Sequence, residues 1–367
     1  MSIYWSSLTK NITPYIAGEQ PKDKDKFIKL NTNENPYPPS PNVIEAVKKA
    51  ANDRLRLYPD PNCTEFREAA AEILGIKPQQ VFAGNGSDEI LAFSFAAFFE
   101  SGAAVGKILF PDITYSFYPV YANLWNIPFA TVPLNDDFSI NTAGFLPSAG
   151  SPVGGVVLPN PNAPTGIALP LTDMLSLARQ LGKQNKVFIS DEAYIAFGAE
   201  TTVPYINDYP NLLSVHTLSK GCSLAGLRFG YAAACEELIE GLCRIRDSFN
   251  SYPVDRLAQA GAVAAIKDKT YYDEINRRVV LTRERTAKEL VSLGFIVLPS
   301  SANFLFIKAQ NIAGDVFLSA LRDRKILVRR FNKDRIKDYL RVSIGTDKDM
   351  DVFLDACKEI LCEPSVR

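Results

Sequence analysis

The chain contains 367 residues, of which 47% are hydrophobic and 22% are charged, as in an ordinary globular protein. Its 40 basic and 41 acidic residues leave a net charge of −1, which excludes electrostatic attraction to nucleic acid or to an anionic membrane. A chain of this length predicts one large and one smaller domain.

The cysteines and the apolar runs indicate the cellular compartment of the protein. Six cysteines lie at positions 63, 222, 235, 243, 357 and 362 without a Cys-x-x-Cys pair, which argues against a zinc site or a disulfide framework and favours a reducing compartment. Residues 1–26 are polar and hold no signal-peptide core, and the longest apolar run, residues 90–99, is too short to span a bilayer. We therefore expect a cytoplasmic protein without a membrane partner.

The first half of the chain predicts an α/β fold. A proline- and asparagine-rich arm over residues 1–40 precedes a predicted helix over 41–53, and further helices are predicted over 64–74 and 171–181. Short apolar runs between them predict buried strands over 81–84, 107–110, 129–132, 155–158, 187–190, 212–216 and 229–234. This alternation predicts a mainly parallel sheet that binds ligands beyond the carboxyl ends of its strands.

The pattern changes after about residue 250. A long charged helix is predicted over 271–294, followed by short strands over 303–308 and 339–345. This order predicts a smaller α+β domain. The expected division is therefore an arm over residues 1–40 that joins the small domain, a large domain over 41–252 and a small domain over 253–367.

One lysine, Lys220, lies in a run of apolar and small residues from Ser214 to Ala234. A buried ammonium loses affinity for its proton, so such a lysine can become a nucleophilic amine. Schiff-base chemistry with a carbonyl cofactor requires an amine of this kind.

Other polar residues follow the predicted strands. Gly86, Ser87 and Asp88 begin a helix after the strand 81–84, where free N–H groups favour a phosphate, although an ordinary N-cap explains them equally well. Asn160 and Asn162 lie in a rigid turn after the strand 155–158, and a purely structural turn explains them equally well.

The next two strand ends add charged and hydroxyl groups. Asp191 ends a strand and can pair with a cationic ligand nitrogen, and the phenol of Tyr194 can reach a neighbouring oxygen; a solvated sheet edge is the alternative explanation. Phosphate ligands are offered near Lys220 by Thr217, Ser219 and Arg228. A phosphate cradle, a carboxylate, a phenol and an amine together are what pyridoxal 5′-phosphate (PLP) requires.

These motifs resemble the fold-type I PLP enzymes, and among them the histidinol-phosphate aminotransferase family. The resemblance covers nearly the whole chain and rests on a set of short motifs, which are TPY (13–15), LNTNENPYPPSP (30–41), LYPDP (57–61), SDE (87–89), PDITYSFY (111–118), PNAPTG (161–166), DEAY (191–194), Ser219–Lys220 with Arg228, SANF (301–304), ILVRRF (326–331) and LRVSIG (340–345). The set is specific, whereas no single member of it would be.

The resemblance implies roles for residues of this chain. Lys220 would carry PLP and move the proton, Asp191 would pair with the ring nitrogen, and Tyr194 would bind the ring 3′ oxygen. Tyr115 would stack on the ring. The phosphate would be held by Gly86, Ser87, Asp88, Ser219 and Arg228, with Thr217 nearby and with Tyr58 from a second subunit of a homodimer. Anionic substrate groups would be bound by Tyr15, Arg329 and Arg341, although surface ion pairs could also explain the two arginines.

One position departs from the family pattern. Most members have an asparagine immediately before the proline of this turn, where it helps to bind the ring oxygen, and here that residue is Ala163. We expect either that Asn162 takes over this role or that Tyr194 acts alone.

The implied reaction is transamination between L-histidinol phosphate and 2-oxoglutarate in histidine biosynthesis. A threonine-phosphate decarboxylase or an aromatic amino-acid aminotransferase on the same frame is the alternative, because the motifs concern the cofactor more than the substrate.

A PLP-binding regulator is disfavoured, since the chain is not basic and shows no helix-turn-helix. His216 is the single histidine, which excludes a metal site built from several histidines, and we expect it to be a packing residue. The role of Cys222 stays open.

Overall fold

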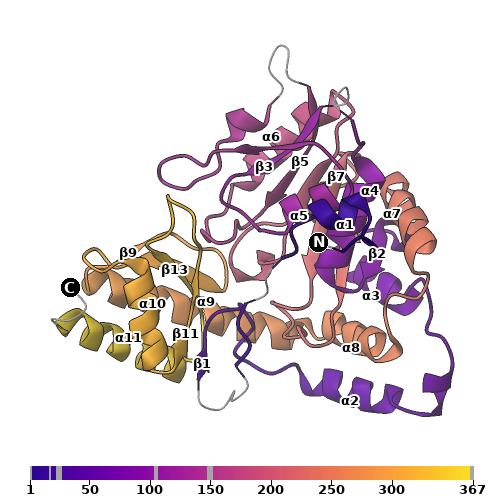
Figure 1. Ribbon diagram of the computed structural model, residues 1–367. Helices are drawn as coiled ribbons and strands as arrows, with labels where there is room; N and C mark the ends of the chain where they lie inside the picture. Colours follow the sequence, from indigo (N-terminus) through magenta and orange to yellow (C-terminus); the bar gives the residue numbers. More distant parts are fainter. Residues whose placement is uncertain (1, 16–17, 22–26, 103–105, 147–151, 364–367) are drawn as a thin grey trace.

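A seven-stranded sheet forms the centre of the larger part of the molecule in the computed structural model, which describes residues 2–15, 18–21, 27–102, 106–146 and 152–363 (Figure 1). The strand order is β2–β8–β7–β6–β5–β3–β4. The bounds are β2 (Val81–Gly84), β3 (Lys107–Pro111), β4 (Phe129–Val132), β5 (Val153–Pro159), β6 (Phe188–Asp191), β7 (Leu212–Thr217) and β8 (Gly230–Ala233). Strands β3 to β7 pair in parallel, and β8 runs antiparallel to β7 and β2. The predicted mainly parallel α/β sheet is confirmed.

Helices cover both faces of this sheet because its strands are apolar on both sides. On β5, Val157 packs into the cluster shared with α4 (Gly86–Phe98) and α7 (Glu236–Phe249), while Val156 and Leu158 pack into the cluster shared with α6 (Leu171–Gly182). Side chains of successive strand residues point to opposite faces, so both faces acquire a hydrophobic core. The short α5 (Tyr118–Leu124) joins the first of these clusters.

Three helices pack together at one end of the larger part. They are α2 (Pro41–Ala50), α3 (Thr64–Leu74) and α8 (Arg256–Lys267). Helix α2 is three residues shorter than predicted, because Asn52 takes an extended backbone and its side chain accepts from Arg54 N to start a 3-10 helix. The 3-10 helices of the molecule's described residues are Asp53–Arg56, Pro78–Gln80, Thr142–Phe145, Ile195–Phe197 and Val203–Tyr205.

A smaller part follows α9 (Lys269–Ser292), a long helix that runs along one side of the molecule (Figure 1). Its antiparallel sheet has the order β12–β13–β10–β9. The elements are β9 (Ile296–Val297), β10 (Phe304–Lys308), β12 (Arg329–Arg330), β13 (Tyr339–Ser343), α10 (Gly314–Asp323) and α11 (Asp347–Cys362). The predicted long helix and the two predicted strands of this region are confirmed as α9, β10 and β13.

The N-terminal arm joins this smaller part. After the short α1 (Ser7–Asn11), strand β1 (Ile28–Lys29) pairs in parallel with β11 (Ile326–Leu327), and the chain then passes between the two parts toward α2 (Figure 1). The arm therefore brings residues 31–35 to the boundary between the sheets. None of the helices described combines the length and the hydropathy that crossing a bilayer requires.

Candidate active site

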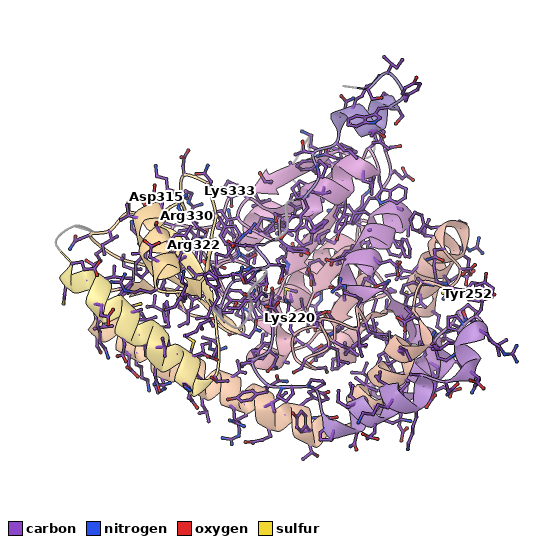
Figure 2. The ribbon with its side chains drawn as sticks, turned by 60° about the horizontal axis from the view of Figure 1, so that its bottom comes forward. Lys220, Tyr252, Asp315, Arg322, Arg330 and Lys333 are labelled. Carbon is purple, nitrogen blue, oxygen red and sulfur yellow. The ribbon has the colours of Figure 1, made fainter. Side chains whose placement is uncertain are left out.

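A cavity of about 290 Å3 opens at the edge of the central sheet where β2, β6 and β7 end. Lys220 lies within it, near the middle of the molecule in Figure 2. The predicted site residues that line this cavity are Tyr15, Ser87, Asp88, Tyr115, Asp191, Tyr194, Thr217, Ser219, Lys220, Arg228 and Arg341. Residues from the arm, the large sheet and the small sheet thus meet at one place.

Lys220 lies in the loop that follows β7, and its amine contacts main chain rather than a carboxylate. Nζ donates to the carbonyl oxygen of Thr32 at 2.9 Å, and the Lys220 carbonyl accepts from Asn35 Nδ2 at 3.1 Å. Burial lowers the pKa of Lys220 to about 8, because a buried ammonium loses its hydration; the charge of Glu34 opposes this shift. On the order of a tenth of the amine is therefore neutral and nucleophilic at pH 7.

Asp191 supplies a buried carboxylate at the end of β6. Its Oδ2 accepts from Tyr118 Oη at 2.7 Å, and its Oδ1 accepts from the N–H of Ala193 at 3.3 Å. Burial raises the pKa of Asp191 to about 6, although both hydrogen bonds favour the ionised form. Sequence reasoning missed Tyr118, which lies three residues after Tyr115 in a motif already singled out and resembles an ordinary core aromatic.

Tyr194 points its hydroxyl at the arm. Oη accepts from Asn33 Nδ2 at 3.0 Å, and the ring meets Phe304 edge-on at 5.1 Å between centroids. Burial raises the pKa of Tyr194. Ala163 packs in a small apolar cluster with Ala302 and Phe304 against Tyr194.

Asn162 is turned away from the cavity. Its Nδ2 donates to the carbonyl of Ile113 and to Thr165 Oγ1, both at 3.0 Å, and its Oδ1 is buried without a partner among the described residues. We expected either that Asn162 replaces the usual asparagine or that Tyr194 acts alone, and neither expectation included Asn33. The amide of Asn33 reaches Tyr194 from a segment more than 100 residues earlier in the chain.

A group of donors beside the start of α4 is suited to an anion. Arg228 Nη2 donates to Asp88 Oδ2 at 3.0 Å, and its Nη1 lies 3.5 Å from Ser219 Oγ. Gly86 has φ +80°, and a Cβ there would lie 2.7 Å from Arg228 Nη2, so a side chain would fill this space. The first N–H groups of a helix attract anions such as phosphate.

The backbone approaches closely around the same group of donors. A Cβ at Gly230 would lie 2.5 Å from the backbone N of Ser87, so β8 can begin here only with a glycine. Tyr115 Oη donates to Asp88 Oδ1 at 2.7 Å. The Asp88 carboxylate thus accepts from both Tyr115 and Arg228, and the other N–H groups of the Arg228 guanidinium remain for an anion.

Arg341 and Arg329 lie opposite each other on the paired strands β13 and β12. Arg341 Nη2 donates to the carbonyl of Asn31 at 3.1 Å, and its Nε is buried without a partner in the described part of the chain. Burial lowers the pKa of Arg341, and the neighbouring charge of Arg329 adds to this effect. In the residues that the structure describes, neither guanidinium forms an ion pair. Arg341 lines the cavity, whereas Arg329 is absent from its lining.

The two remaining predicted tyrosines lie in different places. Tyr15 stacks on Phe117 at 4.3 Å between centroids and lines the cavity. Tyr58 lies outside it, is 79% exposed and stacks on Tyr252, which Figure 2 shows on the far side of the molecule from the small sheet. A single chain therefore does not bring Tyr58 to its own cavity.

His216 and Cys222 lie beside the site rather than in it. His216 Nε2 is 2.9 Å from Ser214 Oγ, and the ring stacks on Tyr231 at 4.6 Å between centroids. Burial lowers the pKa of His216, which keeps the ring neutral, and burial raises the pKa of Cys222 to about 12, which keeps the thiol protonated.

The cavity offers what a cofactor with a phosphate, an aldehyde, a cationic ring nitrogen and a ring oxygen needs. The amine of Lys220, the carboxylate of Asp191, the phenol of Tyr194 and the donors around Gly86 and Arg228 all reach it. The residues present thus fit PLP.

Comparisons with known proteins agree with this geometry. The family described as aminotransferase class I and II matches residues 25–357. The chain is 52% identical to the histidinol-phosphate aminotransferase of Clostridium acetobutylicum, over 98% of this chain and 100% of the relative, and 49% identical to that of Acetobacter pasteurianus, over the whole of both. The crystal structure of histidinol-phosphate aminotransferase from Sinorhizobium meliloti in complex with pyridoxal-5′-phosphate superposes with a TM-score of 0.86 at 25% identity, and 98% of each chain is covered.

Proposed function

Because the chain belongs to the class I and II aminotransferase family, we propose that it is a PLP-dependent aminotransferase that transfers the amino group of L-histidinol phosphate to 2-oxoglutarate. This reaction would serve histidine biosynthesis. The observation that carries the proposal is the position of Arg341, which is buried without an anionic partner among the described residues, in the same cavity as the amine of Lys220.

The cofactor residues are proposed from their positions. Bound PLP would withdraw electrons from the reacting carbon of the substrate, which is the chemistry that the protein itself lacks. Asp191 would balance the charge of the ring nitrogen, Tyr194 would donate to the ring oxygen, and Tyr115 would cover the ring. The phosphate would be held by Gly86, Ser87, the backbone of Asp88, Thr217, Ser219 and Arg228.

Lys220 would both attach the cofactor and move the proton. A general base works best when its pKa lies near the working pH, and the pKa of Lys220 is lowered by burial to about 8. With the cofactor bound, Nζ of Lys220 would be placed to take a proton from the substrate carbon and to return it on the cofactor side.

Both substrates carry anions, which the arginines of the small sheet would bind. A guanidinium forms paired hydrogen bonds with a phosphate or a carboxylate, so one receptor can accept the phosphate of the donor and then the carboxylate of the acceptor. Arg341 and Arg329 are neighbours across two strands, and Arg341 and Tyr15 both line the cavity.

A homodimer would complete the site. Tyr58 stacks on Tyr252, and both side chains are exposed, as are Leu55 and Leu57 beside Tyr58 in the chain and Phe249 beside Tyr252 in the chain. Clusters of this kind on a surface mark association with another chain. A second copy would cover this patch, and Tyr58 would then reach the phosphate of the partner's cofactor.

We place this dimer in the cytoplasm, because all six cysteines carry free thiols.

The visible absorbance of PLP-loaded protein tests the proposal. L-Histidinol phosphate added without an acceptor should remove the band of the lysine-bound cofactor, and 2-oxoglutarate should restore it. A band that ignores this donor but responds to aromatic amino acids would assign the protein to that aminotransferase class instead. Release of carbon dioxide from O-phosphothreonine without an acceptor would indicate a decarboxylase. If no visible band forms, the assignment of Lys220 is wrong.

A further inference from the structure

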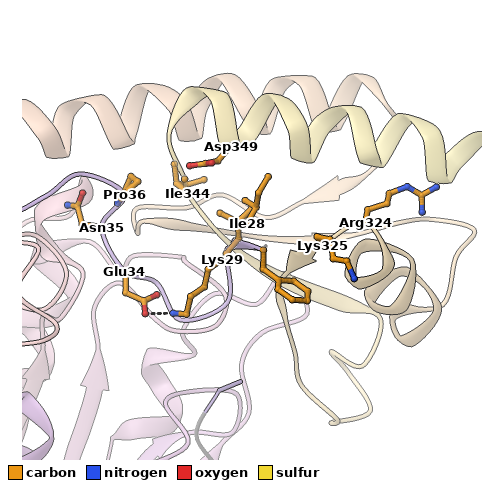
Figure 3. A pocket seen from close by; sticks show the side chains of 12 residues that line it. Ile28, Lys29, Glu34, Asn35, Pro36, Arg324, Lys325, Ile344 and Asp349 are labelled. Atoms are coloured by element: carbon orange, nitrogen blue, oxygen red, sulfur yellow. Dashed lines mark hydrogen bonds and ion pairs between the residues drawn. The ribbon is translucent and has the colours of Figure 1, made fainter. Parts of the chain in front are cut away.

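Residues 29–36 of the arm separate the active site from a second cavity. Thr32 and Asn33 line the active-site cavity. Lys29, Glu34 and Asn35 line a more open cavity of about 720 Å3 on the other side, where Glu34 pairs with Lys29 (Figure 3). The arm thus forms a wall of the site, and its own groups contact Lys220 and Tyr194.

This wall contacts the amine, the phenol and the anion receptor. The carbonyl of Thr32 accepts from Lys220, the side chain of Asn33 donates to Tyr194, and the carbonyl of Asn31 accepts from Arg341. Two of these contacts use main-chain carbonyls. The contact to Tyr194 alone among the three depends on the identity of an arm side chain.

The surroundings of Asn33 determine which atom of its amide faces Tyr194. Ser343 Oγ accepts from the backbone N of Asn33 at 2.9 Å and therefore has its hydrogen free to donate to Asn33 Oδ1 at 2.8 Å. Asn303 Nδ2 donates to the Asn33 carbonyl at 3.0 Å. With Oδ1 accepting from Ser343, the NH2 group faces Tyr194. Asn33 is 1% exposed and has φ +57°, a backbone conformation that asparagine tolerates better than most residues.

A tyrosine hydroxyl has one hydrogen and can also accept. Because Asn33 supplies a hydrogen to Oη, the hydrogen of the hydroxyl itself is left to donate elsewhere. On the turn side the ring meets Ala163, and Asn162 directs its NH2 group to Ile113 and Thr165. Among the described residues, the remaining direction for this hydrogen is the cavity.

We propose that Asn33 is a positioning residue for catalysis, which donates to Tyr194 Oη and thereby directs the hydroxyl hydrogen of Tyr194 toward the ring oxygen of the cofactor. This inference rests on the proposed function, because it needs PLP in the cavity. Asn33 supplies from the arm the amide donor that the turn at Ala163 lacks. Its anchoring to Ser343 and Asn303 also makes the donor depend on the position of the small sheet.

The pH titration of the visible absorbance of PLP-loaded protein tests the role of Asn33. A hydrogen bond from Tyr194 stabilises an ionised ring oxygen, so its loss should raise the titration midpoint. Asn33→Gly tolerates the positive φ and removes the donor, and we expect the midpoint to rise by about one pH unit. Asn33→Asp keeps the shape but offers an oxygen that accepts the hydrogen of Tyr194, so the rise should be at least as large.

Two further variants separate this role from a structural one. In the Tyr194→Phe background, Asn33→Gly should no longer move the midpoint. Asn31→Ala removes another buried arm amide, which contacts the Glu19 carbonyl, and should leave the midpoint unchanged. An unchanged midpoint in Asn33→Gly, or a shift that persists without the Tyr194 hydroxyl, would overturn the proposal.

A measurement on cofactor-free protein covers the case in which a variant loads PLP poorly. The ultraviolet titration of Tyr194, taken as the difference between each protein and its Tyr194→Phe partner, should show a higher phenol pKa in Asn33→Gly than in the wild type. An unchanged phenol pKa would count against Asn33. Absence of a visible band in the wild type would instead refute the proposed function, so the two failures are distinguishable.

Discussion

The amine of Lys220 donates a hydrogen bond to the main-chain carbonyl of Thr32, a residue 188 positions earlier in the chain. A carbonyl dipole holds the amine in place without the full charge of a carboxylate. Burial therefore dominates, and the pKa of Lys220 is lowered to about 8. The arm thus holds the amine in position, whereas burial of the loop lowers the pKa and makes the amine reactive.

Replacing Lys220 tests its role most directly. Lys220→Ala should abolish transamination and the visible band of PLP-loaded protein, because the attaching amine is gone. The fold should persist, since the variant removes a buried amine with a lowered pKa. Circular dichroism and absorbance are the measurements, and Lys48→Ala, on the exposed side of α2, is the matched control. Substantial residual turnover would assign the reaction to another lysine.

Removing one hydroxyl tests the dimer. Tyr58→Phe should weaken PLP retention about tenfold, the cost of one hydrogen bond to a charged group. Equilibrium dialysis measures this retention. Mixed with Lys220→Ala, the Tyr58→Phe protein should recover activity, because some heterodimers would contain one site with both residues intact. If mixing restores nothing while subunits are shown to exchange, each site is built from one chain.

Substitution of Arg341 on β13 tests the proposed anion receptor, and an arginine on the paired strand β12 provides the control. Arg341→Gln should raise KM for both L-histidinol phosphate and 2-oxoglutarate by about 10- to 100-fold, because a charge-assisted hydrogen bond is lost. Arg330→Gln is the matched control, since Arg330 donates to the carbonyl of Lys337, is absent from the cavity lining and follows Arg329 on β12. Equal effects of the two variants would favour a general influence of surface charge.

Asp191 should destabilise the cofactor-free protein above about pH 6. Its pKa is raised from 3.8 to about 6, so the folded state binds more protons than the unfolded chain between these values. Stability therefore falls as the pH rises through this window, by on the order of 3 kcal/mol at most. Asp191→Asn keeps the acceptor for Tyr118 and removes the charge.

Urea unfolding of cofactor-free protein measures this effect. At pH 7.5, Asp191→Asn should unfold at a higher urea concentration than the wild type, and the difference should vanish near pH 4. The same variant should bind PLP poorly, because the ring nitrogen loses its counter-charge. A variant that is less stable at both pH values would show that Asp191 stabilises the fold through its hydrogen bonds alone.

Local patterns in the sequence predicted the parts of the site that depend on strand ends. Asp191 and Lys220 follow apolar runs that become β6 and β7, and parallel strands bring their carboxyl ends to one edge. Tyr118 and Asn33 were missed as functional groups, because each acts through a side chain far away in the chain. Their partners, Asp191 and Tyr194, are 73 and 161 residues distant, and a local pattern carries no signal of such a pairing.

The attachment of the arm also orders events during synthesis. Asn33 is held by Ser343, which the ribosome adds 310 residues later. At about 5 to 20 residues per second, the arm waits roughly 15 to 60 s for its partner strand. The large sheet can form in that interval, whereas the wall of the active site cannot. The nascent chain therefore stays without a complete site until its last strand is made, and premature termination before β13 yields a protein without the Ser343 contacts that hold Asn33.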